Sequence, residues 1–274
     1  MTPKHLFILC PPASGSTLLW KLITTSPQVS AFRQEGQALV KSQLFTRDRW
    51  NAQKAIDWER VREKWNQTWD LSKPVLLEKS PPHLVRAGQL AAHFPNSYFV
   101  IMIRDPYAFC EGVKRRWGSR KPLLSGFTYF NLARFWAICA RYQIANQKNL
   151  ENTLFLSYEE LTGQPAEAAR RLLAFVPELD GLDWEQKFSV FEKSQAIANL
   201  NDQQIARLCD SQLFEINQAL KRCPGLLAHF GYPFREPHQA VSFKLARKII
   251  SRLVSLNRQP PAVRWHQWKE GGKR

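Results

Sequence analysis

Paired cysteines and long apolar runs are both missing from this sequence. The 274 residues include five cysteines, an odd number, and no two of them form a Cys-x-x-Cys pair. This pattern fits a reducing compartment better than a disulfide framework. No stretch approaches the roughly 20 apolar residues of a membrane-spanning helix, and the apolar run at 6–9 is too short for the core of a secretion signal. We therefore expect a cytoplasmic protein.

Acidic side chains are also scarce. Lys and Arg number 39 against 23 Asp and Glu, which gives a formal net charge of +16 at pH 7. A basic surface attracts polyanionic ligands, but without an RNA-binding fingerprint, zinc finger or basic recognition helix, nucleic acid is not the expected partner. Residues 241–274 are strongly basic and are predicted to form a C-terminal helix and tail. We expect this helix to pack on the domain, with peripheral contact to an anionic membrane as the alternative.

The lysine of a nucleoside-triphosphatase loop is missing as well. The apolar run at 6–9 leads into small residues and then an apolar helix, which predicts a strand, a tight loop and a helix. The N–H groups of such a loop and the positive end of the helix dipole bind phosphate. The pattern G-x-x-x-x-G-K-[ST] would place Gly at 10 and Lys at 16, but the chain has Cys10 and Ser16. The loop is therefore suited to a nucleotide phosphate that is not hydrolysed, which argues against an ATP-dependent P-loop kinase.

Short apolar runs followed by polar residues predict the strands of a parallel sheet that is covered on both faces. These runs lie at 5–9, 29–32, 75–77, 97–103 and 153–156. Helices are predicted between and after them, at 17–24, 84–93, 105–117, 127–149, 166–175 and 202–221. The alternation predicts a single P-loop-like α/β domain over residues 1–240, with a parallel sheet flanked by helices on both faces.

Polar residues follow several of the predicted strands. The small-residue loop follows the first strand, and Lys79, Arg104 and Tyr158 come soon after the later ones. Because the carboxyl ends of parallel strands meet at one edge, where open α/β sheets bind ligands, we expect these residues to lie close together. The sequence shows no His and Cys cluster with metal-ligand spacing, so no metal is expected.

Motifs at these positions resemble those of sulfotransferases that use 3′-phosphoadenosine-5′-phosphosulfate (PAPS). The resemblance is carried by the loop at 10–20, Glu-Lys-Ser-Pro at 78–81, Arg-Asp-Pro at 104–106, Tyr-Glu-Glu-Leu at 158–161 and Gly-Tyr at 231–232. An ordered series spread over most of the chain is more specific than a single motif. The pattern is closest to the protein-tyrosine sulfotransferase-like and bacterial branch. It implies an enzyme that takes the sulfuryl group of PAPS and releases 3′-phosphoadenosine 5′-phosphate (PAP).

The resemblance implies a set of residues that bind the donor nucleotide. Arg104 would bind the 3′ phosphate through its guanidinium, although a salt bridge to Asp105 is the alternative. Gly112 replaces a serine that the family places against this phosphate, and Arg116 matches an arginine of the protein-tyrosine branch. Tyr158 would lie near the nucleotide or only cap its strand. The loop residues that would hold the 5′ phosphosulfate are Ala13, Ser14, Gly15, Ser16, Thr17 and Leu18.

The resemblance also implies catalytic residues. Lys79 matches a lysine that stabilises the charge building on the departing phosphate. Glu35 resembles the carboxylate base of the protein-tyrosine branch. Small-molecule enzymes of the family keep a histidine where this chain has Pro81, so His83 is the alternative base.

The acceptor is implied only in outline, as a hydroxyl or amine on a small molecule, a glycan or a peptide. Ala13 replaces an arginine that the protein-tyrosine branch carries in its loop, so the acceptor need not be a tyrosine peptide. Residues 41–73, rich in Trp, Lys and Arg, are predicted to be an insertion that covers the acceptor site. Gly112 and Ala13 also leave open a family member that binds nucleotide without catalysis.

Overall fold

The computed structural model describes residues 2–46, 48–117, 128–186, 188–190, 193–195, 197–237, 239, 241–242, 245–247 and 249–251. The chain divides into two compact units. The first, called the sheet unit below, comprises Met1–Arg104 and Tyr142–Asn199. The second, the helical unit, comprises Asp105–Arg141 and Leu200–Arg274.

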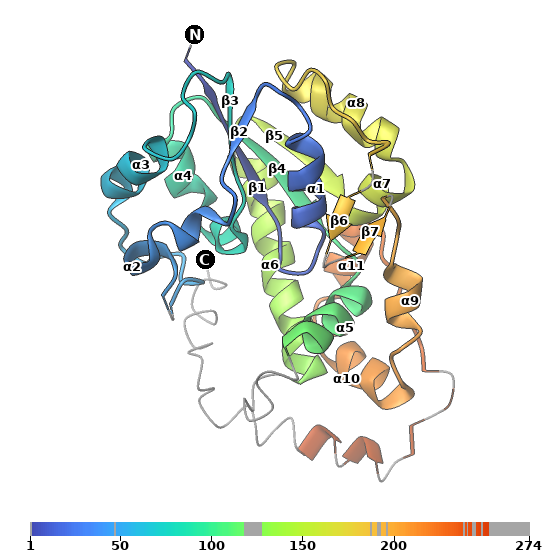
Figure 1. Ribbon diagram of the computed structural model, residues 1–274. Helices are drawn as coiled ribbons and strands as arrows, with labels where there is room; N and C mark the ends of the chain where they lie inside the picture. The colour runs from blue at the N-terminus through green and yellow to red at the C-terminus, as the bar shows by residue number, and fades with distance from the viewer. Residues whose placement is uncertain are drawn as a thin grey trace. The chain divides into compact units, whose positions relative to one another are not determined.

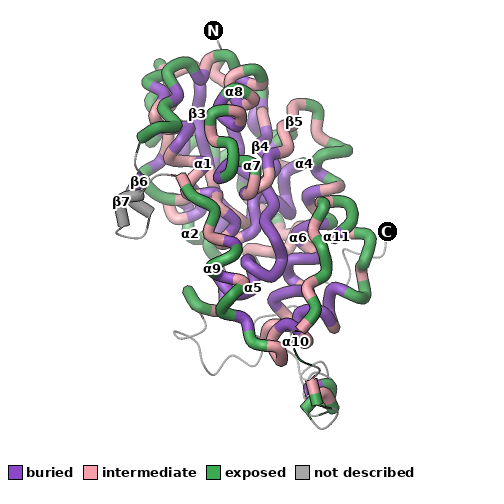
Figure 2. The backbone as a smooth tube through the Cα atoms, turned by 90° about the vertical axis from the view of Figure 1, so that its right-hand side faces the viewer, coloured by how far each residue is buried: buried purple, intermediate pink, exposed green. Residues whose placement is uncertain are grey.

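Five parallel strands form the main sheet, in the order β2-β3-β1-β4-β5 (Figure 1). Strand β1 lies in the middle and pairs with both β3 and β4, and these central strands are buried along most of their length (Figure 2). The predicted α/β fold with an all-parallel sheet is therefore confirmed. The strands are β1 Lys4–Leu9, β2 Val29–Ala31, β3 Val75–Glu78, β4 Ser97–Ile103 and β5 Thr153–Ser157.

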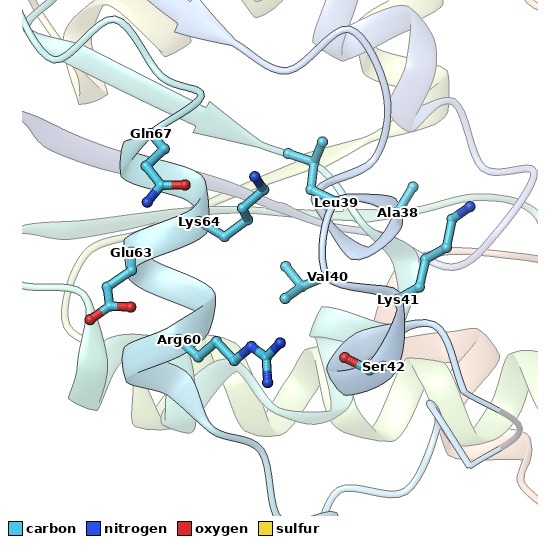
Figure 3. A pocket seen from close by; sticks show the side chains of 9 residues that line it. All are labelled: Ala38, Leu39, Val40, Lys41, Ser42, Arg60, Glu63, Lys64 and Gln67. Atoms are coloured by element: carbon cyan, nitrogen blue, oxygen red, sulfur yellow. The ribbon is translucent and has the colours of Figure 1, made fainter.

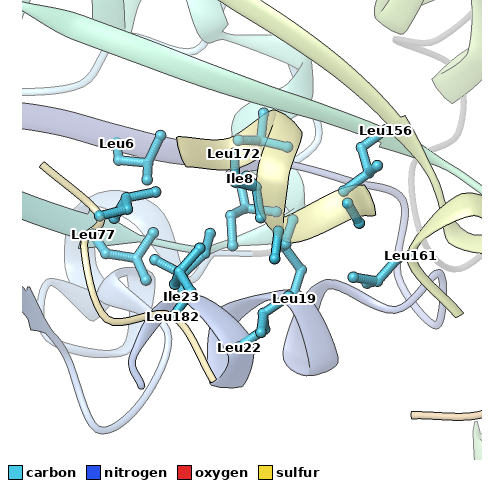
Figure 4. Close-up of a cluster of buried hydrophobic side chains, with 14 of the residues drawn as sticks. Leu6, Ile8, Leu19, Leu22, Ile23, Leu77, Leu156, Leu161, Leu172 and Leu182 are labelled. Atoms are coloured by element: carbon cyan, nitrogen blue, oxygen red, sulfur yellow. The ribbon is translucent and has the colours of Figure 1, made fainter. Parts of the chain in front are cut away.

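One face of this sheet carries an aliphatic core. Successive side chains of a strand point to opposite faces, and Leu6 and Ile8 of β1 point to this one (Figure 4). Helices α1 (Ser16–Ile23) and α8 (Pro165–Phe175) pack over it. Further buried members of the cluster are Leu19, Leu22, Ile23, Leu77, Val100, Met102 and Leu172.

The other face is covered largely by aromatic residues. The ring of Phe7 lies 5.5 Å from that of Phe94 and 6.5 Å from that of Trp65, measured between centroids. Trp65 belongs to α3 (Trp58–Asn66), and Phe94 ends α4 (Ala87–His93). Part of the segment 41–73, predicted to be an insertion, thus belongs to the core, and its covering of an acceptor site stays a prediction.

The predicted helix at 84–93 is interrupted. A 3₁₀ helix, η2 (Pro81–Val85), precedes α4, and Arg86 between them has a φ of −133°, outside the helical region. A short hairpin that the sequence did not predict is also present. The remaining short elements of the sheet unit are η1 Gly36–Ala38, α2 Lys41–Leu44, α7 Tyr158–Gly163, β6 Phe188–Val190 and β7 Lys193–Gln195.

The helix predicted at 202–221, in the helical unit, is also broken. Cys209 is extended at the break, and its N–H donates to the Gln212 side chain at 3.1 Å, which starts a new helix. Helices of this unit, wholly or in part, include α5 Pro106–Trp117, α6 Tyr129–Asn149, α9 Asn201–Ile205, α10 Asp210–Leu220 and α11 Pro224–Phe230.

Asp105 starts helix α5. Its Oδ1 accepts the N–H groups of Tyr107 and Ala108 at 2.8 and 3.1 Å, and its Oδ2 lies 3.3 Å from the Arg235 guanidinium. A carboxylate at this position satisfies amide donors that have no partner within the helix. The aspartate of the Arg-Asp-Pro motif therefore caps a helix and pairs with Arg235.

The basic C-terminal segment is described only in part. Residues 245–247 and 249–251 are helical, and residues 252–274 lie outside the described part of the chain. Its contact with an anionic membrane stays a prediction. No helix among the described residues is long and apolar enough to cross a membrane.

Truncation of Trp65 to alanine should strongly destabilise the protein. The side chain is fully buried, packs near Phe7 and Phe94, and donates its indole N–H to the Gly36 carbonyl at 3.1 Å. Loss of a buried tryptophan costs about 3–5 kcal/mol, measurable by urea unfolding. The matched control Trp184→Ala, at a side chain that is 36% exposed, should cost about 1 kcal/mol or less. Equal losses would contradict the assignment of Trp65 to the core.

Candidate active site

The segment between β1 and α1 forms a tight loop at the carboxyl edge of the sheet. Ala13 and Gly15 have left-handed backbone conformations, with φ of 57° and 93°. Gly15 is the N-cap of α1, and its carbonyl accepts the N–H groups of Leu18 and Leu19 at 2.9 and 3.0 Å. The amino end of α1, with its N–H groups and positive dipole, therefore lies where the sequence predicted a phosphate cradle.

Tyr158 and Arg104 brace this loop from two other strand ends. A Cβ added to Gly15 would lie 2.6 Å from Cδ2 of Tyr158, so only glycine fits against the ring. The Arg104 guanidinium lies 3.9 Å from the centroid of the same ring and donates to the Ala13 carbonyl at 3.0 Å. The ends of β1, β4 and β5 thus meet, as predicted, and Tyr158 contacts the loop itself.

The loop is closely packed from within. Ser14 is fully buried and Ser16 is 6% exposed. Burial raises the pKa of the Cys10 thiol to about 12, against smaller opposing effects of Ser16 and of the charges on Lys79 and Arg104. Cys10 is therefore protonated at neutral pH and serves as packing rather than as a nucleophile.

Gln143 is a buried residue that the sequence analysis missed. Its amide donates to the Leu9 carbonyl at 2.6 Å and to the Met102 carbonyl at 2.8 Å, which joins the ends of β1 and β4. These strands lead into the loop and into Arg104. The sequence of α6 holds several polar residues, so nothing local marked Gln143 for this role.

Glu35, Lys79 and Thr17 meet although they are distant in sequence. The Lys79 ammonium lies 3.2 Å from Oε1 of Glu35 and 3.3 Å from Oγ1 of Thr17. The other carboxylate oxygen of Glu35 accepts a hydrogen bond from Gln37. The side chains of Lys79 and Glu35 are 12% and 34% exposed. A carboxylate, a cation and the first turn of α1 therefore share one partly accessible place, and the catalytic roles of Glu35 and Lys79 stay predictions.

His83, the alternative base, lies in a different environment. It is 1% exposed, and its Nε2 lies 3.1 Å from Oε2 of Glu78, itself buried. The rings of Trp58 and Trp65 lie 6.4 and 5.7 Å away. A base must come within hydrogen-bond reach of the acceptor proton, so this burial favours Glu35 over His83.

Gly112 and Arg116 belong to α5, in the helical unit rather than the sheet unit. Gly112 is buried, whereas Arg116 is exposed, with its guanidinium 5.0 Å from the Trp117 ring centroid. Their contact with the nucleotide stays a prediction.

A surface pocket of about 520 Å³ opens between the segment that follows Glu35 and helix α3 (Figure 3). Arg60 and Lys64 of α3 face Val40 and Leu39 across it (Figure 3). The pocket is lined by Ala38, Leu39, Val40, Lys41, Ser42, Arg60, Glu63, Lys64 and Gln67.

Among the described residues, no group of three or more His, Cys, Asp or Glu is placed to hold a metal ion.

The sheet order and the loop at the amino end of α1 define a P-loop-like α/β protein that lacks the triphosphatase lysine. A profile of the sulfotransferase family matches residues 3–186, which include Lys79, Arg104 and Tyr158. The chain belongs to the sulfotransferase family, and the resemblance drawn from its motifs is confirmed. A search of curated proteins gives no match.

Solved sulfotransferase structures resemble this chain. One from Alicyclobacillus acidocaldarius has a TM-score of 0.55 at 12% identity and covers 85% of this chain and 98% of its own. One from Mycobacterium avium has a TM-score of 0.49 at 13% identity, covering 93% of this chain and 77% of its own. A mouse sulfotransferase complexed with PAP has a TM-score of 0.47 at 13% identity, and the match covers 84% of this chain and 89% of the mouse chain. The first of these shows a shared fold.

Gly15→Ala should destabilise the protein and weaken nucleotide binding. The φ of 93° disfavours alanine, and the new Cβ would clash with Tyr158. The left-handed conformation alone costs about 1–2 kcal/mol, measurable by urea unfolding, with PAP affinity followed by calorimetry. Gly88→Ala is the matched control, because a Cβ there meets nothing within 4 Å in helix α4. It should gain up to about 1 kcal/mol. Tolerance of alanine at both positions would argue against the packed loop.

Proposed function

We propose that this protein transfers a sulfuryl group from PAPS to a hydroxyl or amine of an acceptor. The observation that carries the proposal is the meeting of Glu35, Lys79 and Thr17 at the amino end of α1. Family membership supports this reaction class, and the missing triphosphatase lysine counts against phosphoryl transfer from ATP. The acceptor is a small molecule, a glycan or a peptide.

The residues present fit the donor nucleotide. The close contact of Gly15 with Tyr158 holds the loop in a fixed shape, so residues 13–18 can present backbone N–H groups and hydroxyls to the 5′ phosphosulfate. When bound, PAPS supplies the sulfuryl group and a phosphate leaving group. A guanidinium has five N–H donors, so Arg104 can support the Ala13 carbonyl and also bind the 3′ phosphate. Gly112 and Arg116 stay predicted contacts of the nucleotide, from the resemblance alone.

Lys79 stabilises charge in this proposal. Its ammonium lies against Thr17, in the first turn of α1, where the loop would hold the 5′ phosphate. A cation fixed there lowers the energy of the transition state as negative charge develops on the leaving phosphate. The contact with Glu35 holds the ammonium in place before an acceptor enters.

Glu35 is the proposed base. Its 34% exposure makes the carboxylate accessible, whereas His83 is enclosed by aromatic rings. An acceptor hydroxyl that binds beside Oε1 can give its proton to Glu35 while its oxygen attacks sulfur. Gln37 holds Oε2 and thereby orients the carboxylate. The alternative, a member that binds nucleotide without catalysis, would use the loop but not this base.

PAP should bind tens-fold more tightly than AMP, which lacks the 3′ phosphate. A charge-assisted hydrogen bond contributes about 1.5–3 kcal/mol, which corresponds to roughly 10- to 100-fold in affinity. Arg104→Met should remove most of this preference in calorimetric titrations, while Arg170→Met, at an exposed surface ion pair, should retain it. Equal affinity of the unmodified protein for PAP and AMP would disprove the role of Arg104.

Glu35→Gln removes the proposed base, and Lys79→Met removes the cation proposed to stabilise the transition state. Each should reduce turnover by roughly 10²–10⁴-fold. Both variants should bind PAP with an affinity within a few-fold of that of the unmodified protein, because neither side chain is needed to hold the nucleotide. Release of PAP from PAPS, with a panel of simple phenols and sugars as acceptors, measures turnover. The controls Glu185→Gln and Lys148→Met change exposed residues and should behave as the unmodified protein. Full activity in the Glu35 variant would eliminate it as the base.

A further inference from the structure

The carboxylate of Glu78 is buried next to the candidate active site and has no catalytic role in the proposed reaction. Glu78 is the last residue of β3 and directly precedes Lys79, yet its side chain is only 1% exposed. It lies on the aromatic face of the sheet, near Trp65 and His83. A charge buried among such residues is costly unless hydrogen bonds and partners compensate for its lost hydration.

The contacts of Glu78 connect the two segments that carry the proposed catalytic residues. Its Oε1 accepts the Gly36 N–H at 2.7 Å and the Ser80 hydroxyl at 2.5 Å. The Ser80 oxygen in turn accepts the Gln37 N–H at 3.1 Å. Gly36 directly follows Glu35, and Ser80 directly follows Lys79.

The fit at Gly36 shows that this connection is close. A Cβ there would lie 2.7 Å from Oε1 of Glu78 and 3.0 Å from Cε2 of Trp65. The Trp65 indole also donates to the Gly36 carbonyl at 3.1 Å. The N–H group of Gly36 is thus bonded to Glu78 and its carbonyl to Trp65, so buried side chains fix both polar groups of the backbone after Glu35.

His83 completes the surroundings of Glu78. Its Nε2 lies 3.1 Å from Oε2, the carboxylate oxygen that faces away from Gly36. Burial opposes ionisation of Glu78, but the attraction of His83 and the hydrogen bonds from Ser80 and Gly36 outweigh it and lower the pKa of the carboxyl. Glu78 is therefore an acceptor of hydrogen bonds at neutral pH.

We propose that Glu78 is a positioning residue, which sets the separation between Glu35 and Lys79 by holding the backbone segments next to both. The proposal rests on the proposed function of that pair. Glu35 and Lys79 meet at 3.2 Å although 44 positions separate them in sequence. Glu78 supplies the buried link between their two segments through contacts with Gly36 and Ser80.

The test compares Glu78→Ala with Glu78→Gln. Alanine removes the link, whereas glutamine keeps an oxygen that can accept from Gly36 and Ser80. Glu78→Ala should lose roughly 100-fold in kcat, the effect of a catalytic group misplaced by about 1 Å. Its KM for PAPS and its PAP affinity should stay within a few-fold. Glu78→Gln should recover most of kcat, and Ser80→Ala, which breaks only the half of the link that runs through Ser80, should lie between the two.

Glu111→Ala is the matched control, because Glu111 is also a buried carboxylate, 4% exposed and paired with Arg115 and Arg207. It should lower the unfolding midpoint without lowering kcat in the folded protein. A crystal structure of Glu78→Ala gives a second measurement that needs no acceptor. The distance between Oε1 of Glu35 and Nζ of Lys79 should exceed 4 Å in it.

The outcomes separate this inference from the proposed function. Unchanged kcat in Glu78→Ala, or a Glu35–Lys79 distance that stays at 3.2 Å, would overturn the positioning role. The proposed function itself fails if the unmodified protein neither prefers PAP to AMP nor releases PAP from PAPS, whereas full turnover in Glu35→Gln and Lys79→Met would remove only the roles assigned to that pair. If those variants lose turnover while Glu78→Ala does not, only the positioning role is wrong.

Discussion

Parallel pairing of β1 with β3 on one side and with β4 on the other is the constraint on which the candidate site depends. This pairing brings the loop after β1 between the strand ends that carry Lys79 and Arg104. Because all these strands run in the same direction, their carboxyl ends share one edge, and the amino end of α1 lies there too. The backbone hydrogen bonds of the sheet therefore place the loop, Lys79 and Arg104 close together, whatever their side chains contribute.

Buried polar side chains then refine this arrangement. Gln143 joins the carbonyls at the ends of β1 and β4, and Glu78 connects the segments after β2 and β3. Apolar packing is non-directional and tolerates small shifts, whereas hydrogen bonds fix distance and angle. The interior below the site thus holds directional contacts in a core that is otherwise aliphatic on one face and aromatic on the other.

Residues that match the family's motifs also have structural roles of their own. Tyr158 packs on Gly15, Arg104 holds the Ala13 carbonyl, and Asp105 caps α5. A motif residue that braces the loop keeps the binding groups in place without ligand, which reduces the ordering cost on binding. Loss of such a residue therefore alters both stability and binding, and substitutions at these positions must be interpreted with both measured.

The sequence alone determined the strands, the loop and the places where polar residues follow strand ends, because apolar periodicity and small-residue loops are local signals. It did not determine that the helix at 84–93 would break at Arg86, that His83 would be buried against Glu78, or that Gln143 would join two strands. The match of Glu35 and Lys79 to family motifs implied a shared site, but only tertiary structure brought them to 3.2 Å. Contacts between residues far apart in sequence depend on sheet order and packing, and no local pattern encodes which buried polar group will meet which partner.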